Sequence, residues 1–157
     1  NPFFAYLDRM KLIRRWGLMR NTVPENDMEH SMQTALIAHG LAVLGKTRHQ
    51  RDIDPERVVM LALYHDVSEV ITGDLPTPVK YKSPDIQGAY RGLEESAREQ
   101  LLSMLPEDMR PAFQTYLLPD ENTYEWRLVK AADRISAYLK CLEEECSSNR
   151  HKPSRHC

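Results

Sequence analysis

Apolar residues recur at three- and four-residue steps along most of the chain, which is the period of amphipathic helices. The first run begins at Phe3 and is predicted to form a helix that ends near Trp16. A second predicted helix starts at the capping candidates Asn26 or Asp27 and continues to Gly45. Its apolar face is predicted to consist of Met28, Met32, Ala35, Leu36, Ile37, Leu41 and Leu44.

A third helix has a clear start signal in Asp54-Pro55, an N-cap acid followed by proline at the first helical position. Its apolar run is predicted to continue without a break to about Thr72. The segment 72–81 holds one glycine and two prolines and is predicted to be a stiff loop. The remaining predicted helices span about 83–105, a short stretch after Pro106, and about 121–147.

No segment shows the alternation typical of strands, and there is no internal repeat. At 157 residues and 18.2 kDa the chain has the size of a single domain with one buried core. We therefore predict an all-α fold, a compact single-domain helical bundle of about six helices. Residues 1–149 are assigned to this domain. The tail 150–157 is polar, positively charged and interrupted by Pro153, which is typical of a poorly ordered end or of a remnant of something longer.

Charge and cysteine content narrow the classes of partner. The formal charge of −2 argues against a protein that tracks polymeric nucleic acid, whereas small anions remain possible substrates. No apolar stretch approaches the roughly 18 residues of a membrane helix, so no membrane partner is predicted. Three cysteines (Cys141, Cys146 and Cys157), without CxxC spacing or a preceding signal peptide, indicate a reducing cytoplasm.

The candidate chemistry begins with His65-Asp66, which follows the apolar run 58–64. His30 lies upstream in the second predicted helix, and Asp133 follows Ala131-Ala132 in the last one. A lone His-Asp pair is more simply interpreted as a core histidine beside an exposed acid. An unpaired carboxylate at Asp133, however, would be costly among its apolar neighbours, and a cation removes that cost. The neighbours expected to be buried are Leu128, Val129, Ile135 and Leu139.

The pattern therefore predicts a divalent metal site made of His30, His65, Asp66 and Asp133. On a continuous helix Asp66 and Glu69 would lie about 60° apart and His65 and Glu69 about 40° apart, so that all three share one face. Histidine and aspartate without thiols suit zinc, manganese, cobalt or iron. Four protein ligands leave positions for water and substrate, which is typical of a catalytic site. His39 is expected to be structural or on the surface.

These residues resemble the H…HD…D signature of the HD-domain phosphohydrolases, and the likeness extends to the bacterial 5′-deoxynucleotidase branch over roughly residues 3–149. The matching segments are Arg15-Trp16, Glu29-His30-Ser31, Tyr64-His65-Asp66, Ser68-Glu69, the string Thr72-Gly73-Asp74-Leu75-Pro76-Thr77-Pro78-Val79-Lys80-Tyr81, and Ala132-Asp133. The Gly-Asp-Leu-Pro-Thr-Pro string is the most specific of them, since an HD pair alone is weak. The resemblance implies the HD-domain fold, a homodimer, and hydrolysis of 2′-deoxyribonucleoside 5′-monophosphates to deoxynucleosides and phosphate.

The same resemblance suggests roles for individual residues. Glu69 would be catalytic, either orienting the attacking water or protonating the leaving 5′ oxygen; the simpler interpretation is an exposed helix acid. Arg15 would bind phosphate oxygens. Trp16 would exclude a 2′ hydroxyl, although packing on Leu12 as an i, i+4 pair is an equal alternative. Asp74 would accept the 3′ hydroxyl unless it is only a turn residue.

Thr77 and Lys80 would donate to phosphate, or Lys80 would be a solvated charge. Nothing resembles a set of residues that reads the nucleobase, so a broad base range is expected. Three rival functions remain, and the simplest is a helical interaction protein that binds neither metal nor nucleotide. Another is an HD phosphohydrolase that acts on a triphosphate, a cyclic nucleotide or an alarmone. The third is a regulatory module that binds a nucleotide without turning it over.

Overall fold

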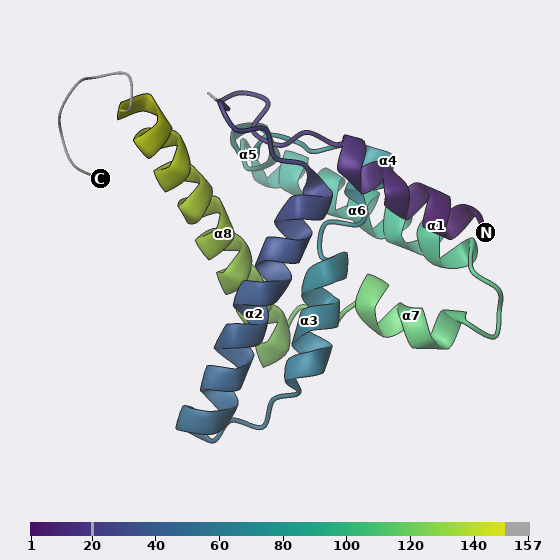
Figure 1. Ribbon diagram of the computed structural model, residues 1–157. Coiled ribbons are helices and arrows are strands. Elements are labelled where there is room, and N and C mark those ends of the chain that lie inside the picture. The colour runs from purple at the N-terminus through teal and green to yellow at the C-terminus, as the bar shows by residue number, and fades with distance from the viewer. Residues whose placement is uncertain (20, 150–157) are drawn as a thin grey trace.

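The computed structural model describes residues 1–19 and 21–149, and helices dominate this part of the chain (Figure 1). The elements are α1 (Pro2–Leu7), the 3₁₀ helix η1 (Asp8–Leu12), α2 (Asp27–His49), α3 (Pro55–Tyr64), α4 (Glu69–Thr72), α5 (Thr77–Lys80), α6 (Pro84–Ser103), α7 (Arg110–Leu117) and α8 (Tyr124–Asn149). The predicted all-α fold is confirmed. The predicted tail 150–157, with His151, His156 and Cys157, lies outside the described residues.

Helices α2, α3 and α8 pack together around the first of two apolar cores. Figure 1 shows α2 crossing α8 with α3 beside it. The members of this core are Ala35, Ala38, Ala42, Ile53, Val58, Leu61, Ala62, Trp126, Val129 and Ala132. The contribution of α2 consists of alanines, and their small side chains allow its backbone to approach α3 and α8 closely.

The apolar face predicted for α2 is wrong in most of its members. Met28, Met32, Leu36 and Leu44 are exposed, whereas Ala35 is buried and Ile37 and Leu41 pack against the first core. The buried side of the helix also carries Asp27, His30, Ser31 and Thr34. The prediction followed the bulkiest side chains. The structure instead places small and polar residues inward, because this side of α2 forms both a tight helix contact and the wall of a polar site.

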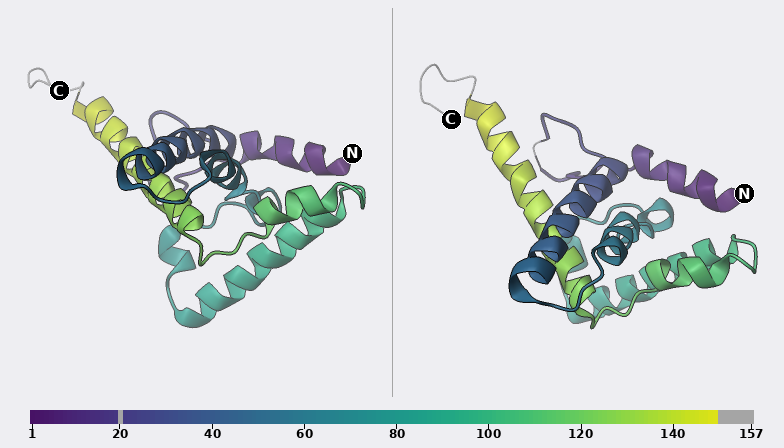
Figure 2. Two further views of the ribbon diagram at one scale, coloured as in Figure 1. Left: turned by 90° about the horizontal axis from the view of Figure 1, so that it is seen from below. Right: turned by 60° about the horizontal axis from the view of Figure 1, so that its bottom comes forward.

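A second core lies under α1, η1, α6 and α7. It consists of Phe3, Met10, Val67, Val70, Leu101, Leu105 and Leu117. In Figure 2, α6 and α7 run beside each other along one side of the molecule, and α1 also contacts α6. Leu61 and Ala62 belong to the first core, whereas Val67 and Val70 belong to the second, so the chain passes from one core to the other at His65-Asp66.

This passage explains why the predicted continuous helix to Thr72 is wrong. Helix α3 ends at Tyr64, and residues 65–68 form turns before α4 begins at Glu69. Several amides here donate to carbonyls three residues earlier, including Val67 to Tyr64 (3.2 Å) and Glu69 to Asp66 (2.9 Å). Tightening the helix in this way redirects Val67 and Val70 into the second core.

The first predicted helix ends four residues earlier than expected. Ile13 is extended, with φ −85° and ψ 112°, and its carbonyl accepts from the amide of Asp27 at 3.1 Å. The amide of Arg15 donates to the carbonyl of Glu25, also at 3.1 Å. Residues 13–15 therefore pair with residues 25–27, and this pairing satisfies backbone groups that a helix to Trp16 would have used internally.

Several other boundaries also differ from the prediction. Helix α2 continues past Gly45 to His49, and Gln50 closes it in the left-handed conformation with φ 50°. Gly45 is instead a packing position, because a Cβ there would lie 2.8 Å from Cδ1 of Ile53. The predicted loop 72–81 contains the one-turn helix α5. None of the helices in the described part of the chain has the length and apolar character needed to cross a membrane.

Candidate metal centre

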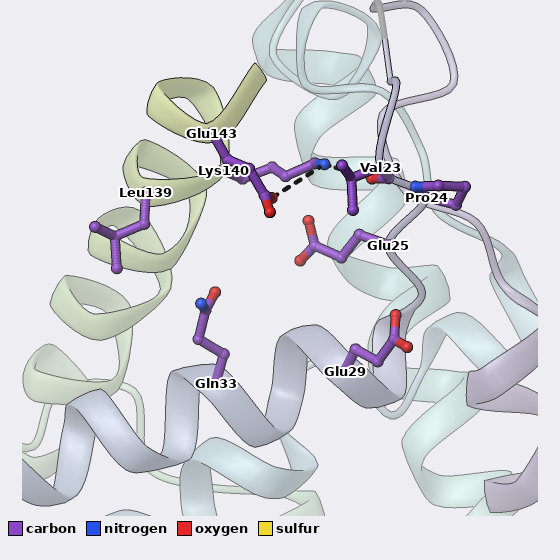
Figure 3. A pocket seen from close by; sticks show the side chains of 8 residues that line it. All are labelled: Val23, Pro24, Glu25, Glu29, Gln33, Leu139, Lys140 and Glu143. Atoms are coloured by element: carbon purple, nitrogen blue, oxygen red, sulfur yellow. Dashed lines mark hydrogen bonds and ion pairs between the residues drawn. The ribbon is translucent and has the colours of Figure 1, made fainter. Parts of the chain in front are cut away.

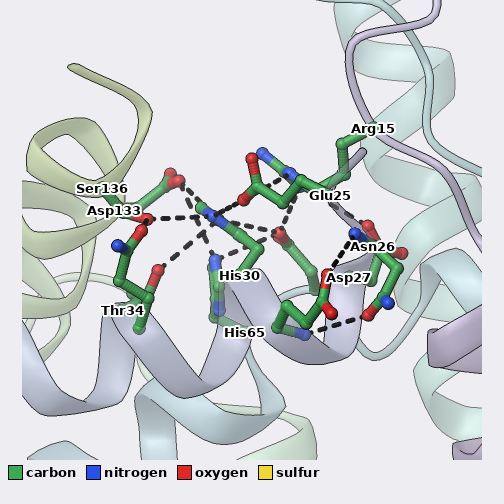
Figure 4. A network of polar contacts seen from close by, with 12 residues as sticks. Arg15, Glu25, Asn26, Asp27, His30, Thr34, His65, Asp133 and Ser136 are labelled. Atoms are coloured by element: carbon green, nitrogen blue, oxygen red, sulfur yellow. Dashed lines mark hydrogen bonds and ion pairs between the residues drawn. The ribbon is translucent and has the colours of Figure 1, made fainter. Parts of the chain in front are cut away.

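The predicted ligands lie at the junction of the two cores and come from three elements. His30 is in the first turns of α2, whose start is fixed by a capping box between Asn26 and Glu29. His65 and Asp66 form the turn after α3, and Asp133 lies within α8. The structure thus brings together side chains that are up to 103 positions apart in the sequence (Figure 4).

His65 is held with one ring nitrogen facing the site. Its Nδ1 donates to the carbonyl of Ala62 at 2.7 Å, which leaves the lone pair on Nε2. Nε2 is buried and has no hydrogen-bond partner, although Oδ2 of Asp66 lies 3.1 Å away. A fixed tautomer with a buried, unpartnered Nε2 is the arrangement that metal-binding histidines have.

His30 is oriented in the same sense by a different set of partners. Its Nδ1 lies 3.2 Å from Oγ of Ser136 and 3.2 Å from Oε1 of Glu25. Ser136 donates its own proton to Gln33 at 2.6 Å, so its oxygen is left to accept from His30. Nε2 of His30 therefore faces the site, where it points toward the carboxylates of Asp66 and Asp133.

Both carboxylates point at these nitrogens. Oδ1 of Asp133 lies 3.1 Å from Nε2 of His30 and 3.9 Å from Nε2 of His65. Oδ2 of Asp66 lies 3.6 Å from Nε2 of His30. Ligand atoms of His30, His65 and Asp133 all lie within 4.8 Å of one another. The predicted fourth ligand, Asp66, is not a member of this group, although its Oδ2 lies close to the Nε2 atoms of both histidines.

The electrostatics also fit a cation. Lone pairs on imidazole nitrogens that face carboxylate oxygens repel each other unless a proton or a metal ion lies between them. Burial lowers the pKa of His30, but its hydrogen bonds to Asp133 and Glu25 outweigh this and raise the pKa to about 9. Burial raises the pKa of Asp133, yet His30 and Lys130 hold it well below its usual value. A proton on His30 and a divalent cation therefore compete for the same position.

Arg15 and Trp16 reach the site from the segment that precedes α2. Nη1 of Arg15 lies 3.1 Å from Oδ2 of Asp66. The indole Nε1 of Trp16 donates to Oε2 of Glu25 at 2.7 Å. The alternative in which Trp16 packs on Leu12 is excluded, because the helix ends at Leu12 and that side chain is exposed. Trp16 also has φ 66°, a strained conformation for a bulky residue.

Glu69 is buried, which excludes the simpler interpretation of an exposed helix acid. The predicted 60° angle between Asp66 and Glu69 assumed a continuous helix, and the structure has turns at 65–68 instead. The amide of Glu69 nevertheless donates to the carbonyl of Asp66, and in such an i to i−3 bond the two side chains point in the same direction. Burial, followed by the charges of Asp66 and Asp27, raises the pKa of Glu69 to about 11. Glu69 therefore keeps its proton at neutral pH in the metal-free protein.

Three predicted substrate residues lie on the segment after α4. Asp74 is half-buried next to Gly73, and its pKa is raised by burial and lowered by Arg15, with a net rise. Thr77 is exposed at the first residue of α5. Lys80 bonds to Glu94 at 2.8 Å and lies over the ring of Tyr90, so its ammonium is already paired.

Several polar residues near the ligands were not predicted, among them Ser136, whose Oγ lies 3.2 Å from Nδ1 of His30. Glu25 contacts His30, Trp16 and Arg15. Lys130 bonds to Oδ2 of Asp133 at 3.0 Å, and Asp27 is fully buried beside Arg15. Lys130 and Ser136 have a sequence signal, since each lies three residues from Asp133 on the same helix. Glu25 and Asp27 face the site because of the backbone pairing described above.

The expected burial around Asp133 is partly wrong. Val129 is buried and Leu128 is half-buried against the first core, but Ile135 and Leu139 are exposed. The apolar surroundings of Asp133 therefore come from one side of α8 only, and the other side faces solvent.

A cavity of about 380 Å³ lies next to the metal centre but is separate from it (Figure 3). Its lining residues are Val23, Pro24, Glu25, Glu29, Gln33, Leu139, Lys140 and Glu143. Glu25 forms the boundary, since it lines the cavity and also contacts His30. None of the four predicted ligands lines the cavity.

A helical fold in which two histidines and two aspartates lie close together matches the H…HD…D pattern noted in the sequence. Solved structures support the fold. An HD-domain phosphohydrolase from Listeria innocua superposes with a TM-score of 0.81 and 22% identity, covering 98% of this chain and 72% of that chain. The HD phosphohydrolase DatZ of cyanophage S-2L, solved with dA and one catalytic Zn²⁺ ion, has a TM-score of 0.54 and 22% identity and covers 98% of this chain and 86% of that one.

Sequence comparison narrows the class further. The 5′-deoxynucleotidase of Cronobacter sakazakii is 51% identical over 150 residues, which is 94% of this chain and 74% of that protein. Residues 2–154 match the family described as 5′-deoxynucleotidase YfbR-like. The chain belongs to this YfbR-like 5′-deoxynucleotidase family, and the resemblance noted from the sequence motifs is confirmed.

Proposed function

We propose that this protein is a metal-dependent phosphomonoesterase that hydrolyses 2′-deoxyribonucleoside 5′-monophosphates to deoxynucleosides and phosphate. The observation that carries the proposal is the cluster of His30, His65 and Asp133, with Asp66 3.6 Å and 3.1 Å from the two histidines, in a chain 51% identical to a 5′-deoxynucleotidase. In this proposal residues 1–149 are the catalytic domain.

The four ligands would hold a divalent cation such as cobalt, manganese, zinc or iron, which supplies Lewis acidity and an activated water when bound. Support for zinc in this fold comes from DatZ, whose structure contains one catalytic Zn²⁺. The carboxylates of Asp66 and Asp133 would neutralise the cation, while the two histidines complete a set that prefers borderline metals.

The residues around the ligands would bind and orient the substrate. Arg15, already 3.1 Å from Asp66, would place its planar guanidinium on the phosphate oxygens as charge grows on them. Trp16, fixed by its bond to Glu25, would leave no room for a 2′ hydroxyl. Asp74 would accept the 3′ hydroxyl, and Thr77 and Lys80 would add donors toward the phosphate. For Lys80 this requires release from Glu94.

Glu69 would be the proton-handling residue. This proposal is supported by the burial of Glu69 and by the hydrogen bond from its amide to the carbonyl of Asp66. Glu69 is not a member of the cluster of candidate ligand atoms. It would either orient the attacking water or protonate the leaving 5′ oxygen. We expect Glu69→Ala to keep its metal but to turn over slowly.

The experiment that tests the function is a side-by-side panel of deoxyribo- and ribonucleoside monophosphates, with triphosphates, cyclic nucleotides and an alarmone included. Phosphate release is measured on metal-stripped protein and again after adding one metal at a time. We expect metal-dependent release from the deoxynucleoside monophosphates with little dependence on the base. Release from another nucleotide class would favour a rival phosphohydrolase, and nucleotide binding without release would favour a regulatory module.

Variants of the ligands connect the activity to the site. Asp66→Ala and Asp133→Ala should lose both bound metal and phosphate release. His39→Ala is the matched control, because His39 is an exposed histidine on the same helix as His30. Wild-type rates in the two metal-free aspartate variants would refute the assignment.

We also propose that the enzyme is a homodimer that acts in the cytoplasm. Helix α2 has an exposed apolar stripe made of Met28, Met32, Leu36 and Val43, which repeats at helical spacing on the side away from the core. Leu36→Glu should then convert a dimer to a monomer in sedimentation experiments, whereas a wild-type monomer would contradict this interface. The cytoplasmic location remains the prediction made from the cysteine pattern.

A further inference from the structure

Asp27 is the most unusual charged residue near the metal centre. Its side chain is fully buried, and among the described residues the only hydrogen bond of its carboxylate is the one to the carboxyl group of Glu69. A buried carboxylate with so little hydrogen bonding is costly, so its position between two site residues calls for an explanation. Asp27 is not one of the four converging ligands and has no role in the function proposed above.

The first neighbour of Asp27 is Arg15. Nη1 of Arg15 lies 3.6 Å from Oδ1 of Asp27 and 3.1 Å from Oδ2 of Asp66, so the guanidinium is held between a fully buried carboxylate and a candidate ligand. Figure 4 shows Arg15 and Asp27 on the same side of the network. Nε of Arg15 is buried without a hydrogen-bond partner, so attraction to the flanking carboxylates has a large share in its orientation.

The second neighbour is Glu69. The carboxyl groups of Asp27 and Glu69 form a side-chain hydrogen bond with each other. Two carboxyls can bond only when one carries the proton, and an ionised Asp27 would then accept the proton of Glu69. Asp27 thus contacts both of the side chains that are proposed to act on the phosphate and on the proton.

A simpler explanation is that Asp27 is an acid in the first turn of α2, placed there by the helix dipole. Such acids are typically exposed, as Asp85 is in the first turn of α6. The dipole accounts for a negative charge at this position but not for the complete burial of the side chain between Arg15 and Glu69.

We propose that Asp27 is a positioning residue, whose buried carboxylate fixes the guanidinium of Arg15 and the carboxyl group of Glu69 in the orientation that hydrolysis uses. The role rests on the proposed phosphomonoesterase function. Asp27 does not touch substrate or metal and acts only through these two neighbours.

The test compares Asp27→Asn with wild type, with Asp85→Asn as the matched control. Kinetics of phosphate release are measured on a metal-loaded enzyme with a deoxynucleoside monophosphate. For Asp27→Asn we expect kcat to fall about tenfold, because a tenfold loss corresponds to losing one contact with a charged group. KM should not rise. Bound metal should be unchanged, and Tm should rise by about 2 °C or more, because a costly buried charge has been removed. Asp85→Asn should leave kcat unchanged.

Three results would overturn the proposal. An unchanged kcat would show that Asp27 positions nothing that matters for the reaction. A fall in Tm together with kcat would show a structural role. Loss of a bound ion from Asp27→Asn would make the residue a metal ligand. The double variant Asp27→Asn with Arg15→Ala should be no slower than Arg15→Ala alone if Asp27 acts mainly through Arg15, and additive losses would place its effect on Glu69.

A readout independent of activity separates this proposal from the proposed function. The side-chain Nε–Hε resonance of Arg15 can be assigned by NMR from its absence in Arg15→Ala. It should be sharp in wild type and broadened in Asp27→Asn, as the guanidinium loses its fixed orientation. If wild type releases no phosphate but the resonance responds, the function fails and the positioning role holds. If wild type is active and the resonance is identical in both proteins, the positioning role fails.

Discussion

The contact between Glu25 and His30 makes a quantitative prediction about metal affinity. Both oxygens of Glu25 are used as acceptors, Oε1 at 3.2 Å from Nδ1 of His30 and Oε2 at 2.7 Å from Nε1 of Trp16. A glutamine has the same shape but a single acceptor oxygen, so Glu25→Gln cannot satisfy both donors. One of two things must follow: His30 loses part of the support that fixes its tautomer, or Trp16 loses its partner.

We expect Glu25→Gln to bind a divalent cation about 10-fold more weakly, the lower end of what loss of a metal ligand's hydrogen-bond partner costs. Tenfold corresponds to about 1.4 kcal/mol. In a chain of this size that reduces the rise in Tm caused by saturating metal by about 3–6 °C. Ser136 still accepts from Nδ1 of His30, which is why the loss is not larger.

In the assay, metal-stripped protein is titrated with Co²⁺ or Zn²⁺. Calorimetry measures the affinity for the metal, and Tm is measured at each metal concentration. Glu29→Gln is the matched control, because Glu29 also lines the neighbouring cavity but bonds only to the amide of Asn26 among the contacts the structure gives it. An affinity in Glu25→Gln within twofold of wild type, measured in the same buffer, would refute the reasoning.

Three further predictions follow from the structure. The pKa of His30 is raised from 6.5 to about 9 by Asp133 and Glu25 against the effects of burial and Arg15, so the stabilisation is complete below about pH 6.5 and is lost as pH rises through 9. The Tm of metal-stripped protein should therefore fall as the pH rises over this range. If Tm depends on pH in the same way in His30→Gln as in wild type, the assignment to His30 is contradicted. Trp16→Ala should narrow the difference in kcat/KM between deoxyribo- and ribonucleotides, and an unchanged ratio would count against steric exclusion. Gly73→Ala should lower stability by about 1–3 kcal/mol, because φ 73° with ψ 164° is a conformation that essentially only glycine adopts. Gly88→Ala inside α6 should raise stability by about 0.5–1 kcal/mol. Shifts of the same sign in the two glycine variants, measured by chemical denaturation, would contradict this account.

The order and type of the long helices could be predicted because local signals set them. The Asp54-Pro55 start of α3 and the Ser83-Pro84 start of α6 are both observed, with Asp54 and Ser83 accepting from backbone amides of the first turn. Caps and proline act over a few residues, so their effect does not depend on what packs nearby. The predicted end of the first helix failed for the opposite reason, since Ile13 bonds to Asp27, fourteen residues away.

The inward face of α2 could not be predicted from residue size. Met28, Met32 and Leu36 are the stronger hydrophobes, but Ala35, Ala38 and Ala42 face the core. Which side of a helix is buried depends on how closely its neighbours approach, and that distance is a property of the packed helices rather than of the segment alone.

The sequence by itself determined the chemistry available to this protein, because two histidines and two aspartates within helical segments are recognisable by type and spacing. Only the tertiary structure decided which nitrogen of each histidine faces the site, that Glu25 and Asp27 lie beside the ligands, and that Arg15 is held between Asp27 and Asp66. These features depend on contacts between segments that are distant in the sequence, such as His30 with Asp133 across 103 positions. A hydrogen-bond partner brought in by folding leaves no periodic or spacing signal in the chain, and for that reason the supporting residues of the site became visible only in three dimensions.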